Sequence, residues 1–281
     1  MYMTIDEKNK VWQQFAALRQ DAAVNKPLVH CITHGITMND SANVILAVGG
    51  IPNMASHPKE VVEVGKAAAA LVVNLGNISS ERMEAMMLAG QAAHKDHIPI
   101  LIDLVGVACS TLRRDFAKQF IHEYHPQIIK GNSSEIRAIC GLPSHAVGVD
   151  AGAADAVTAE NFRQAAQDIQ AYALAQHAVL LMSGPVDVIT DGKRTCGVAN
   201  GTAQLARLTG TGCMLGALAG VYIASRMPWE AAVLSAVMMG IAGEEAGRIA
   251  GSRMGTFHMA LLDAFSMMTD THIQQHMKLL F

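Results

Sequence analysis

The sequence predicts an α/β fold in which helices cover both faces of a mostly parallel sheet. Short, nearly all-apolar runs alternate with segments of helical spacing over much of the chain, which is typical of strands buried on both faces. Aromatic residues make up only 5% of the 281 residues, and small side chains let helices pack closely on a sheet. Because no linker, repeat or low-complexity tract interrupts this rhythm, residues 1–281 are expected to form a single domain.

The spacing of apolar residues gives the order of the elements as far as residue 184. Val11, Phe15 and Leu18 recur at helical spacing and predict the first helix. Gly49-Gly50 is a stop signal that ends the second. Helices are expected over 5–23, 38–48, 59–70, 80–94, 113–125, 133–140 and 160–176. Strands, which are short and rich in β-branched residues, are expected over 27–33, 51–55, 71–75, 98–106, 127–132 and 178–184.

The C-terminal third departs from this alternation. Asp191-Gly192 and Asn200-Gly201 are turn signals, so residues 186–201 are expected to form an antiparallel hairpin at one end of the sheet. The rest of the chain has helical spacing, and Pro228 fits the first turn of a helix. These last helices are predicted over 213–225, 228–251 and 256–278.

Composition and motifs disfavour several classes of function. The net charge is −3 without a basic patch, so nucleic acid is not an expected partner. The five cysteines are widely spaced without a Cys/His ligand pattern, which argues against a zinc site and against disulfides. Reduced thiols, an N-terminus without an apolar signal core and the lack of a long apolar stretch favour a cytoplasmic protein without membrane partners. No G-x-G-x-x-G follows the first strand, which disfavours a dinucleotide-binding dehydrogenase.

The stretch LTGTGCMLGA, at 208–217, is the main candidate for a binding loop. Gly210 and Gly212 permit positive φ and close approach of the backbone to a ligand. The helix that follows leaves its first N–H groups unpaired and carries partial positive charge, so the loop favours a phosphate. Cys213 at this helix start is expected to have a lowered pKa and to act as a weak base or a nucleophile. A small capping residue in a packing turn is the structural alternative.

Two carboxylates follow predicted strands. Asp103 closes the apolar strand IPILIDL, and Glu135 lies in the first turn of the helix after Gly131-Asn132. Because ligands of open α/β sheets bind beyond the carboxyl ends of the strands, both are expected at one cleft. Mg²⁺ is commonly held by one or two carboxylates, so a magnesium site is predicted. Loop capping by Asp103 and helix capping by Glu135 are the alternatives.

Two further features lie at strand ends. Residues 33–43 form a dense polar cluster in which capping is expected, and His30 and His34 lack metal-ligand spacing, which favours structural roles for both. Met54 lies where a thioether could touch a flat apolar ligand, whereas most other methionines are expected in the core.

Taken in order, the motifs resemble the hydroxyethylthiazole kinase family of the ribokinase-like superfamily. They are VHCIT, TMNDSAN, IPNMA, ALVVNLG, IDLVGV, KGNSSEI, VDVITDG and TGTGCML, between Pro27 and Gly251. The resemblance implies a three-layer α/β/α sandwich. It also implies transfer of the ATP γ-phosphoryl group to the alcohol of 4-methyl-5-(2-hydroxyethyl)thiazole with Mg²⁺ in thiamine salvage. Family enzymes are homotrimers with active sites at the subunit interfaces.

The resemblance implies a role for single residues as well. Met54 and Gly210 would contact the thiazole. Lys130, where the family often has arginine, and Ser183, where threonine is common, would contact ATP beside Gly212 of the phosphate loop.

For the chemistry, the resemblance implies that Asp103 and Glu135 manage the magnesium. Cys213 occupies the place of the catalytic aspartate of most ribokinase-like enzymes, where its thiol would orient the alcohol and accept its proton late. Two further departures, His34 for asparagine and Leu104 for proline, bear on substrate choice and on the backbone near Asp103.

Three other functions remain open at this point. The first is a ribokinase-like kinase that acts on a hydroxymethylpyrimidine or pyridoxal-type alcohol. The second is a transferase with Cys213 as nucleophile, which would need a nearby histidine, and the candidates His30 and His34 are distant in sequence. The third is a non-catalytic ligand-binding relative, for which the altered segment IDLVGVACS is the support.

Overall fold

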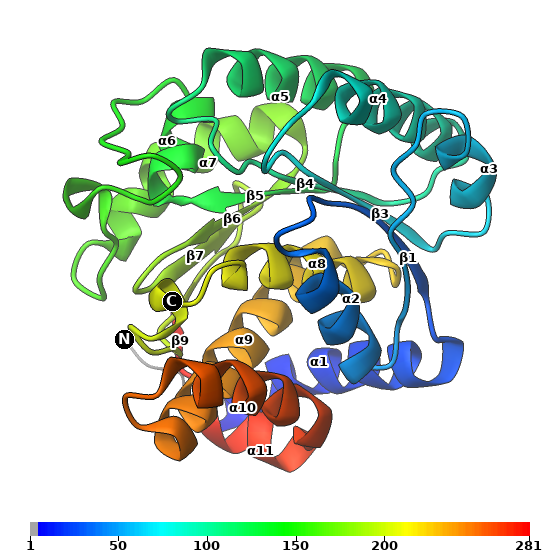
Figure 1. The fold of residues 1–281 in the computed structure, drawn as a ribbon. Helices are drawn as coiled ribbons and strands as arrows, with labels where there is room; N and C mark the ends of the chain where they lie inside the picture. The colour runs from blue at the N-terminus through cyan, green and yellow to red at the C-terminus, as the bar shows by residue number, and fades with distance from the viewer. Residues whose placement is uncertain (1–4) are drawn as a thin grey trace.

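A nine-stranded sheet crosses the centre of the computed structural model, which describes residues 5–281, and helices cover both of its faces (Figure 1). The strand order is β2-β1-β3-β4-β5-β6-β7-β8-β9. Pairs among the first six strands of this order are parallel, and the pairs that involve β7, β8 and β9 are antiparallel. The predicted α/β/α sandwich with a mostly parallel sheet is confirmed, and so is the antiparallel hairpin, although β9 and not the hairpin forms the edge of the sheet.

The elements alternate along the chain as the apolar spacing predicts. The strands are β1 (Leu28–Ile32), β2 (Ile51–Asn53), β3 (Ala70–Asn74), β4 (Ile100–Asp103), β5 (Ile128–Asn132), β6 (Val179–Ser183), β7 (Asp187–Thr190), β8 (Thr195–Val198) and β9 (Leu279–Leu280). The α-helices are α1 (Ile5–Asn25), α2 (Met38–Ala47), α3 (Val61–Gly65), α4 (Ser80–Lys95), α5 (Thr111–Tyr124), α6 (Ser133–Ile139), α7 (Phe162–Gln176), α8 (Thr211–Ile223), α9 (Pro228–Ala250), α10 (Met254–Met267) and α11 (Asp270–His276). Two 3₁₀ turns lie at Ala153–Asp155 and Leu205–Arg207.

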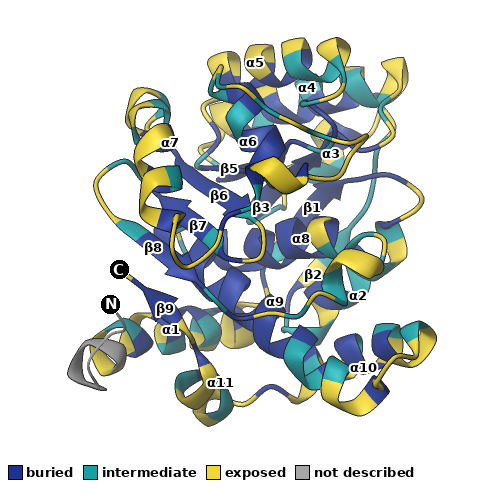
Figure 2. Cartoon of the chain, turned by 90° about the vertical axis from the view of Figure 1, so that its left-hand side faces the viewer, coloured by how far each residue is buried: buried dark blue, intermediate teal, exposed yellow. Residues whose placement is uncertain are grey.

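The sheet separates two hydrophobic clusters. Helices α3 to α7 cover one face, and α1, α2 and α8 to α11 cover the other (Figure 1). Side chains of β3 alternate between them: Leu71 and Val73 belong to the first cluster and Val72 to the second, as the strand period of two requires. The central strands are therefore dark, buried arrows in Figure 2, whereas the edge strand β2 is partly exposed and α4, α5 and α10 expose their outer surfaces.

Helix α8 lies directly on the sheet because glycines at every fourth position remove side chains from the facing surface. A Cβ on Gly220 would lie 2.4 Å from a valine methyl of β3. One on Gly216 would lie 3.2 Å from Asp103 Oδ2, and one on Gly212 would lie 3.3 Å from Lys130 Nζ. This close packing brings the first turn of α8 to the carboxyl ends of β4 and β5.

Two predicted helices differ from the structure. The helix predicted over 59–70 is only the short α3. The helix predicted over 256–278 is wrong: it breaks after Met267, and the Thr269 hydroxyl then caps α11 by accepting a bond from the His272 N–H. The chain continues into β9, which pairs with β8. None of the helices in residues 5–281 combines the length and the apolar character that a bilayer crossing needs.

Candidate active site

A polar row crosses β3, β4 and β5 at their carboxyl ends. Asn74, Asp103 and Lys130 are neighbours in the parallel register. Asn74 Nδ2 donates to Asp103 Oδ2 at 2.9 Å, and Lys130 Nζ donates to Asp103 Oδ1 at 2.9 Å. Asp103 is completely buried and Lys130 is 3% exposed, so the ion pair lies outside bulk water. The structure thus joins the predicted magnesium residue and the predicted ATP residue directly.

Burial and pairing act against each other on this ion pair. Burial raises the pKa of Asp103, while Lys130 and the Asn74 amide oppose the rise. Burial lowers the pKa of Lys130, but the Asp103 carboxylate outweighs it and leaves that pKa above its ordinary value. Lys130 therefore stays a cation, and its Nζ lies under Gly212, at the start of α8.

Glu135 holds the adjacent loop. Its Oε1 accepts from the Gly106 N–H at 2.7 Å and its Oε2 from the Asn132 N–H at 2.8 Å. The Asn132 side chain in turn accepts from the Glu135 N–H, which completes a capping box at the start of α6. Burial raises the pKa of Glu135 to about 7, although both N–H groups oppose the rise. The capping alternative for Glu135 is confirmed by this geometry, and the carboxylate fixes the loop after β4.

Asp103 and Glu135 supply carboxylate oxygens, the donor type that Mg²⁺ takes. Among residues 5–281 no group of three or more His, Cys, Asp or Glu side chains is arranged to hold a metal ion. Both oxygens of Asp103 and both of Glu135 already accept protein hydrogen bonds. Each oxygen keeps a second lone pair, so the donor set suits a Mg²⁺ whose main ligands are phosphate oxygens and water.

The glycine loop before α8 has the backbone that the sequence predicts. Gly210 has φ +94°, and a Cβ there would lie 2.7 Å from Thr37 Cγ2. This position therefore requires glycine for both its dihedral and its space. Gly212 is exposed, so the first N–H groups of α8 face open space next to the Lys130 ammonium. Together they present positive charge suited to an anion.

Cys213 lies in the first turn of α8 with 9% of its surface exposed. Its Sγ is 3.7 Å from His34 Nε2, so a histidine that is 179 residues away in sequence touches the thiol. The expected lowering of the Cys213 pKa is wrong. Burial and the Asp103 carboxylate raise it, and the opposing Lys130 charge does not overcome them. The helix start therefore does not produce a thiolate here.

The remaining predicted residues lie around this centre. Ser183 ends β6, and its hydroxyl donates to the Gly131 carbonyl at 3.4 Å, next to the Glu135 loop. Met54 follows β2, near one edge of the sheet, and its half-buried side chain packs on the cluster that contains α8. Within the described residues, no hydrogen bond joins Met54 to the other predicted site residues.

Two arginines and one aspartate belong to the site although the sequence analysis did not select them. Arg82 donates to the carbonyls of Asn74 and Gly76, and Arg113 donates to the carbonyl of Val105. Their charges lie where β3 and β4 end.

Asp187 at the start of β7 accepts from the Gly184 N–H. Burial raises its pKa to about 7, against the Lys130 charge. The hydrogen bonds that hold these three side chains reach no more than 8 residues along the chain, but they belong to no motif that the sequence analysis selected.

Comparisons with known proteins show the family to which the chain belongs. The sequence profile of the Hydroxyethylthiazole kinase family matches residues 20–271. Hydroxyethylthiazole kinase 2 of Clostridium botulinum (strain Langeland / NCTC 10281 / Type F) is 44% identical over 259 residues, which cover 92% of this chain and 97% of the relative.

The chain belongs to the hydroxyethylthiazole kinase family. A solved hydroxyethylthiazole kinase protein from Pyrococcus horikoshii OT3 has a TM-score of 0.85 and 30% identity, over 95% of this chain and 98% of that one. A ribokinase-like superfamily protein from Enterococcus faecalis V583 has a TM-score of 0.60 at 12% identity, over 89% of this chain and 93% of that one, which supports the ribokinase-like fold alone.

Proposed function

We propose that the protein transfers the γ-phosphoryl group of ATP to the hydroxyl of 4-methyl-5-(2-hydroxyethyl)thiazole in thiamine salvage. The observation that carries the proposal is the arrangement of the Asp103–Lys130 pair under the glycine loop of α8, in a chain of the hydroxyethylthiazole kinase family. This arrangement provides a fixed cation and free backbone N–H groups at one point, which is what phosphoryl transfer requires.

Each side chain has a role in this proposal. Lys130 and the N–H groups around Gly212 would hold the phosphates, and Ser183 would contact ATP from the end of β6. Asp103 and Glu135 would hold Mg²⁺ through water, and the ion would neutralise phosphate charge during transfer. Met54 and Gly210 would contact the thiazole from the opposite side.

Cys213 would face the alcohol. The transition state of phosphoryl transfer is loose, so the alcohol proton leaves late and a strong base is not needed. A buried neutral thiol can orient the hydroxyl in this position. The raised pKa of Cys213 disfavours the alternative of a cysteine nucleophile, which requires a thiolate.

The assay that tests this function is release of ADP with a panel of thiazole, pyrimidine and pyridine alcohols. ADP release that depends on the thiazole alcohol is expected. Preference for hydroxymethylpyrimidine or a pyridoxal-type alcohol would favour the other ribokinase-like kinase, and tight binding without turnover would favour a non-catalytic relative. Covalent labelling of Cys213 by substrate without ADP release would favour a transferase.

Replacing Cys213 tests its role. Cys213→Ala is expected to lower kcat about a hundredfold, the low end of a typical proton-transfer contribution. Cys213→Asp is expected to retain or raise kcat, because a carboxylate accepts the proton without losing one. Cys140→Ala is the control, since this half-buried thiol ends α6 outside the site. An unchanged kcat in Cys213→Ala would remove the thiol from the mechanism.

Two further parts of the proposal concern the whole molecule. The protein would act in the cytoplasm as one ribokinase-like domain over residues 1–281. It would assemble as a homotrimer with active sites at the subunit interfaces. Sedimentation measures the assembly directly.

A further inference from the structure

His34 is fixed against the first turn of α8. Its Nε2 lies 3.7 Å from Cys213 Sγ and 3.3 Å from Thr37 Oγ1. The ring rests on Gly76, where a Cβ would come within 2.4 Å of the imidazole Cδ2. Only 8% of His34 is exposed. These contacts hold the ring with one nitrogen toward the sulfur that the proposed function places against the alcohol.

The hydrogen bonds around the ring leave Nε2 available to the thiol. The single Thr37 hydroxyl proton can go to His34, to Thr33 Oγ1, which is also 3.3 Å away, or to the Cys213 sulfur. When it goes to Thr33, Nε2 can accept the Cys213 S–H, which requires the tautomer with hydrogen on Nδ1. Nδ1 is buried and has no partner among the described residues. A buried polar atom of this kind is unfavourable unless water or a ligand pairs with it, so Nδ1 marks a contact point for the substrate complex.

Burial and nearby charges set the protonation states of His34 and Cys213 before the reaction. Burial, together with Arg82 and Arg113, lowers the pKa of His34 and keeps the imidazole neutral near pH 7. Burial and Asp103 keep Cys213 a thiol. A thiol can accept a proton from the alcohol only if it gives up its own, and the neutral Nε2 is the acceptor next to it.

We propose that His34 is a positioning residue that acts through Cys213 and receives the proton that the thiol passes on. As the alcohol oxygen bonds to the γ-phosphorus, the bond from this phosphorus to the ADP oxygen breaks. The alcohol O–H proton moves to Sγ while the S–H proton moves to Nε2. The result is the phosphate ester, ADP, a neutral thiol and an imidazolium, which releases its extra proton to solvent as the products leave. This relay rests on the proposed function.

A double-variant cycle tests the relay. Single-turnover measurements isolate phosphoryl transfer in wild type, His34→Asn, Cys213→Asp and the double variant. His34→Asn is expected to slow transfer about tenfold or more in the Cys213 enzyme. In the Cys213→Asp enzyme it is expected to change the rate less than about twofold, because the carboxylate accepts the proton itself. An equal loss in both enzymes, or no loss in either, contradicts the relay.

The pH profile gives a readout that a purely structural role would not move. The rate of phosphoryl transfer is expected to fall at low pH as His34 becomes protonated and can no longer accept a proton. This acid limb of the pH profile is expected to be absent in His34→Asn. Burial raises the pKa values of Glu135 and Asp187 to about 7, and these two groups are expected to keep their own effects in this variant. The charged or titratable groups that face the pair are Arg82 on α4, Arg113 on α5, Cys31 on β1, Asp103 on β4 and Lys130 on β5. An acid limb that is identical in wild type and His34→Asn overturns the proposal.

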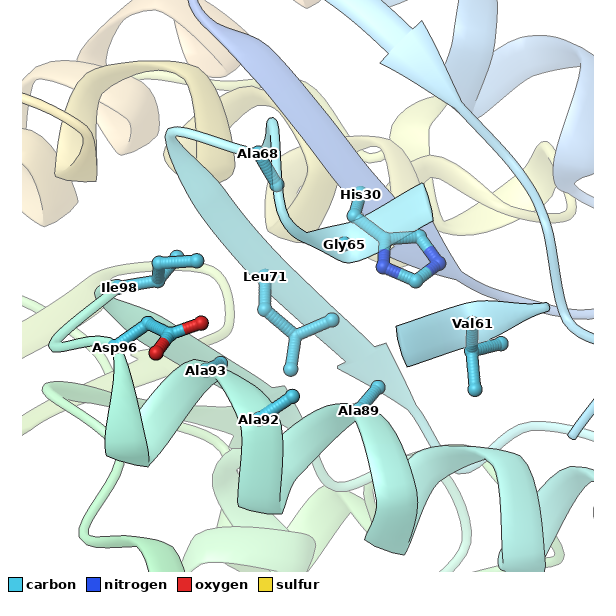
Figure 3. A pocket seen from close by; sticks show the side chains of 10 residues that line it. All are labelled: His30, Val61, Gly65, Ala68, Leu71, Ala89, Ala92, Ala93, Asp96 and Ile98. Atoms are coloured by element: carbon cyan, nitrogen blue, oxygen red, sulfur yellow. The ribbon is translucent and has the colours of Figure 1, made fainter. Parts of the chain in front are cut away.

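His30 provides the matched control. It is a buried histidine of β1 whose Nε2 bonds the Ala55 carbonyl, and it lines a small cavity with Val61, Leu71 and Ala89 (Figure 3). That cavity lies toward the amino ends of β3 and β4, away from Cys213. His30→Asn is therefore expected to leave the rate of phosphoryl transfer unchanged in both the Cys213 and the Cys213→Asp enzymes. It should also leave unchanged the fall in rate at low pH that protonation of His34 causes.

Disulfide exchange at Cys213 separates this proposal from the proposed function, because a thiosulfonate converts the thiol to a methyl disulfide and releases methanesulfinate. The rate of modification by methyl methanethiosulfonate, followed on the Cys213 peptide by mass spectrometry, needs no turnover. His34→Asn is expected to slow it about tenfold at pH 7, because the base that takes the S–H proton is lost. An unchanged rate of Cys213 modification overturns the relay even if the enzyme phosphorylates the thiazole alcohol. If His34→Asn slows modification of Cys213 but the protein shows no thiazole-dependent ADP release, the His34–Cys213 pair is supported and only the proposed function is refuted.

Discussion

Removing the Lys130 ammonium should destabilise the protein in a pH-dependent manner. Lys130→Met keeps most of the side-chain volume but leaves Asp103 Oδ1 without its cation at a completely buried position. Loss of one partner of a buried ion pair costs about 3–5 kcal/mol. The Asn74 amide still bonds Oδ2 and stays available to the remaining carboxyl.

The sign of the pH effect follows from the Asp103 pKa. Burial already raises this pKa, and Lys130 opposes the rise, so the variant raises it further. The folded variant then binds a proton that the unfolded chain has released. Its stability therefore falls as pH rises from the ordinary carboxyl pKa to the folded pKa, by up to about 1.4 kcal/mol per pH unit.

Urea unfolding of wild type and Lys130→Met at pH 5 and pH 8, at one protein concentration, measures the effect. The variant should lose about 3–5 kcal/mol at pH 8 and at least about 1 kcal/mol less than that at pH 5. The control is the Lys130→Met, Asp103→Asn double variant, which has no buried charge at this pair and should recover most of the loss. A loss that is the same at both pH values would refute the reasoning.

Two further changes test the packing around the site. Gly220→Ala should lower the free energy of unfolding in urea by about 1–3 kcal/mol, because the new Cβ would lie 2.4 Å from a valine methyl of β3. Gly255→Ala in α10 is the control: its Cβ meets nothing within 4 Å, so the change should be neutral or slightly stabilising. Equal effects of the two variants would contradict the close approach of α8. The Asp155 carboxylate accepts hydrogen bonds from the His145 N–H and Nδ1 and from the Ser134 hydroxyl, and Asp155→Asn should weaken them. Protease cleavage within 141–157 should therefore become faster. Asp168→Asn, at a more exposed carboxylate, should leave the cleavage rate unchanged. Hydrogen bonds from His145 and Ser134 lower the pKa of Asp155, against the effect of its burial. The bonds that this carboxylate accepts should therefore also weaken as pH falls below the ordinary carboxyl pKa.

The sequence predicted the sheet well because buried parallel strands are apolar on both faces and leave a clear pattern. It failed at one helix break and at one edge of the sheet. The segment 256–278 has continuous helical spacing, and this spacing hid the local Thr269 cap that starts a new helix. The two-residue β9 pairs with the edge that β8 offers, and this partner is not visible in local composition.

The same division holds for the site. Asp103 and Lys130 were predictable because parallel strands end at one edge, and the register then places them side by side. The ion pair between them was not predictable, because the position of a strand end does not tell which atoms the Lys130 and Asp103 side chains reach. The helix-start argument for Cys213 failed because it considered the dipole of α8 without the burial and the neighbouring carboxylate, which outweigh it.

The glycines of α8 connect the packing with the chemistry. They let the helix approach β4 and β5 so closely that Asp103 and Lys130 lose contact with water, which keeps the ammonium charged and in place. The same approach buries Cys213 and brings it near the Asp103 carboxylate, so its thiol stays protonated. A site that gains a fixed, buried cation in this way loses a thiolate at the same helix turn. The proton acceptor must then come from outside α8, and His34, from the loop after β1, is the neutral base that touches the sulfur.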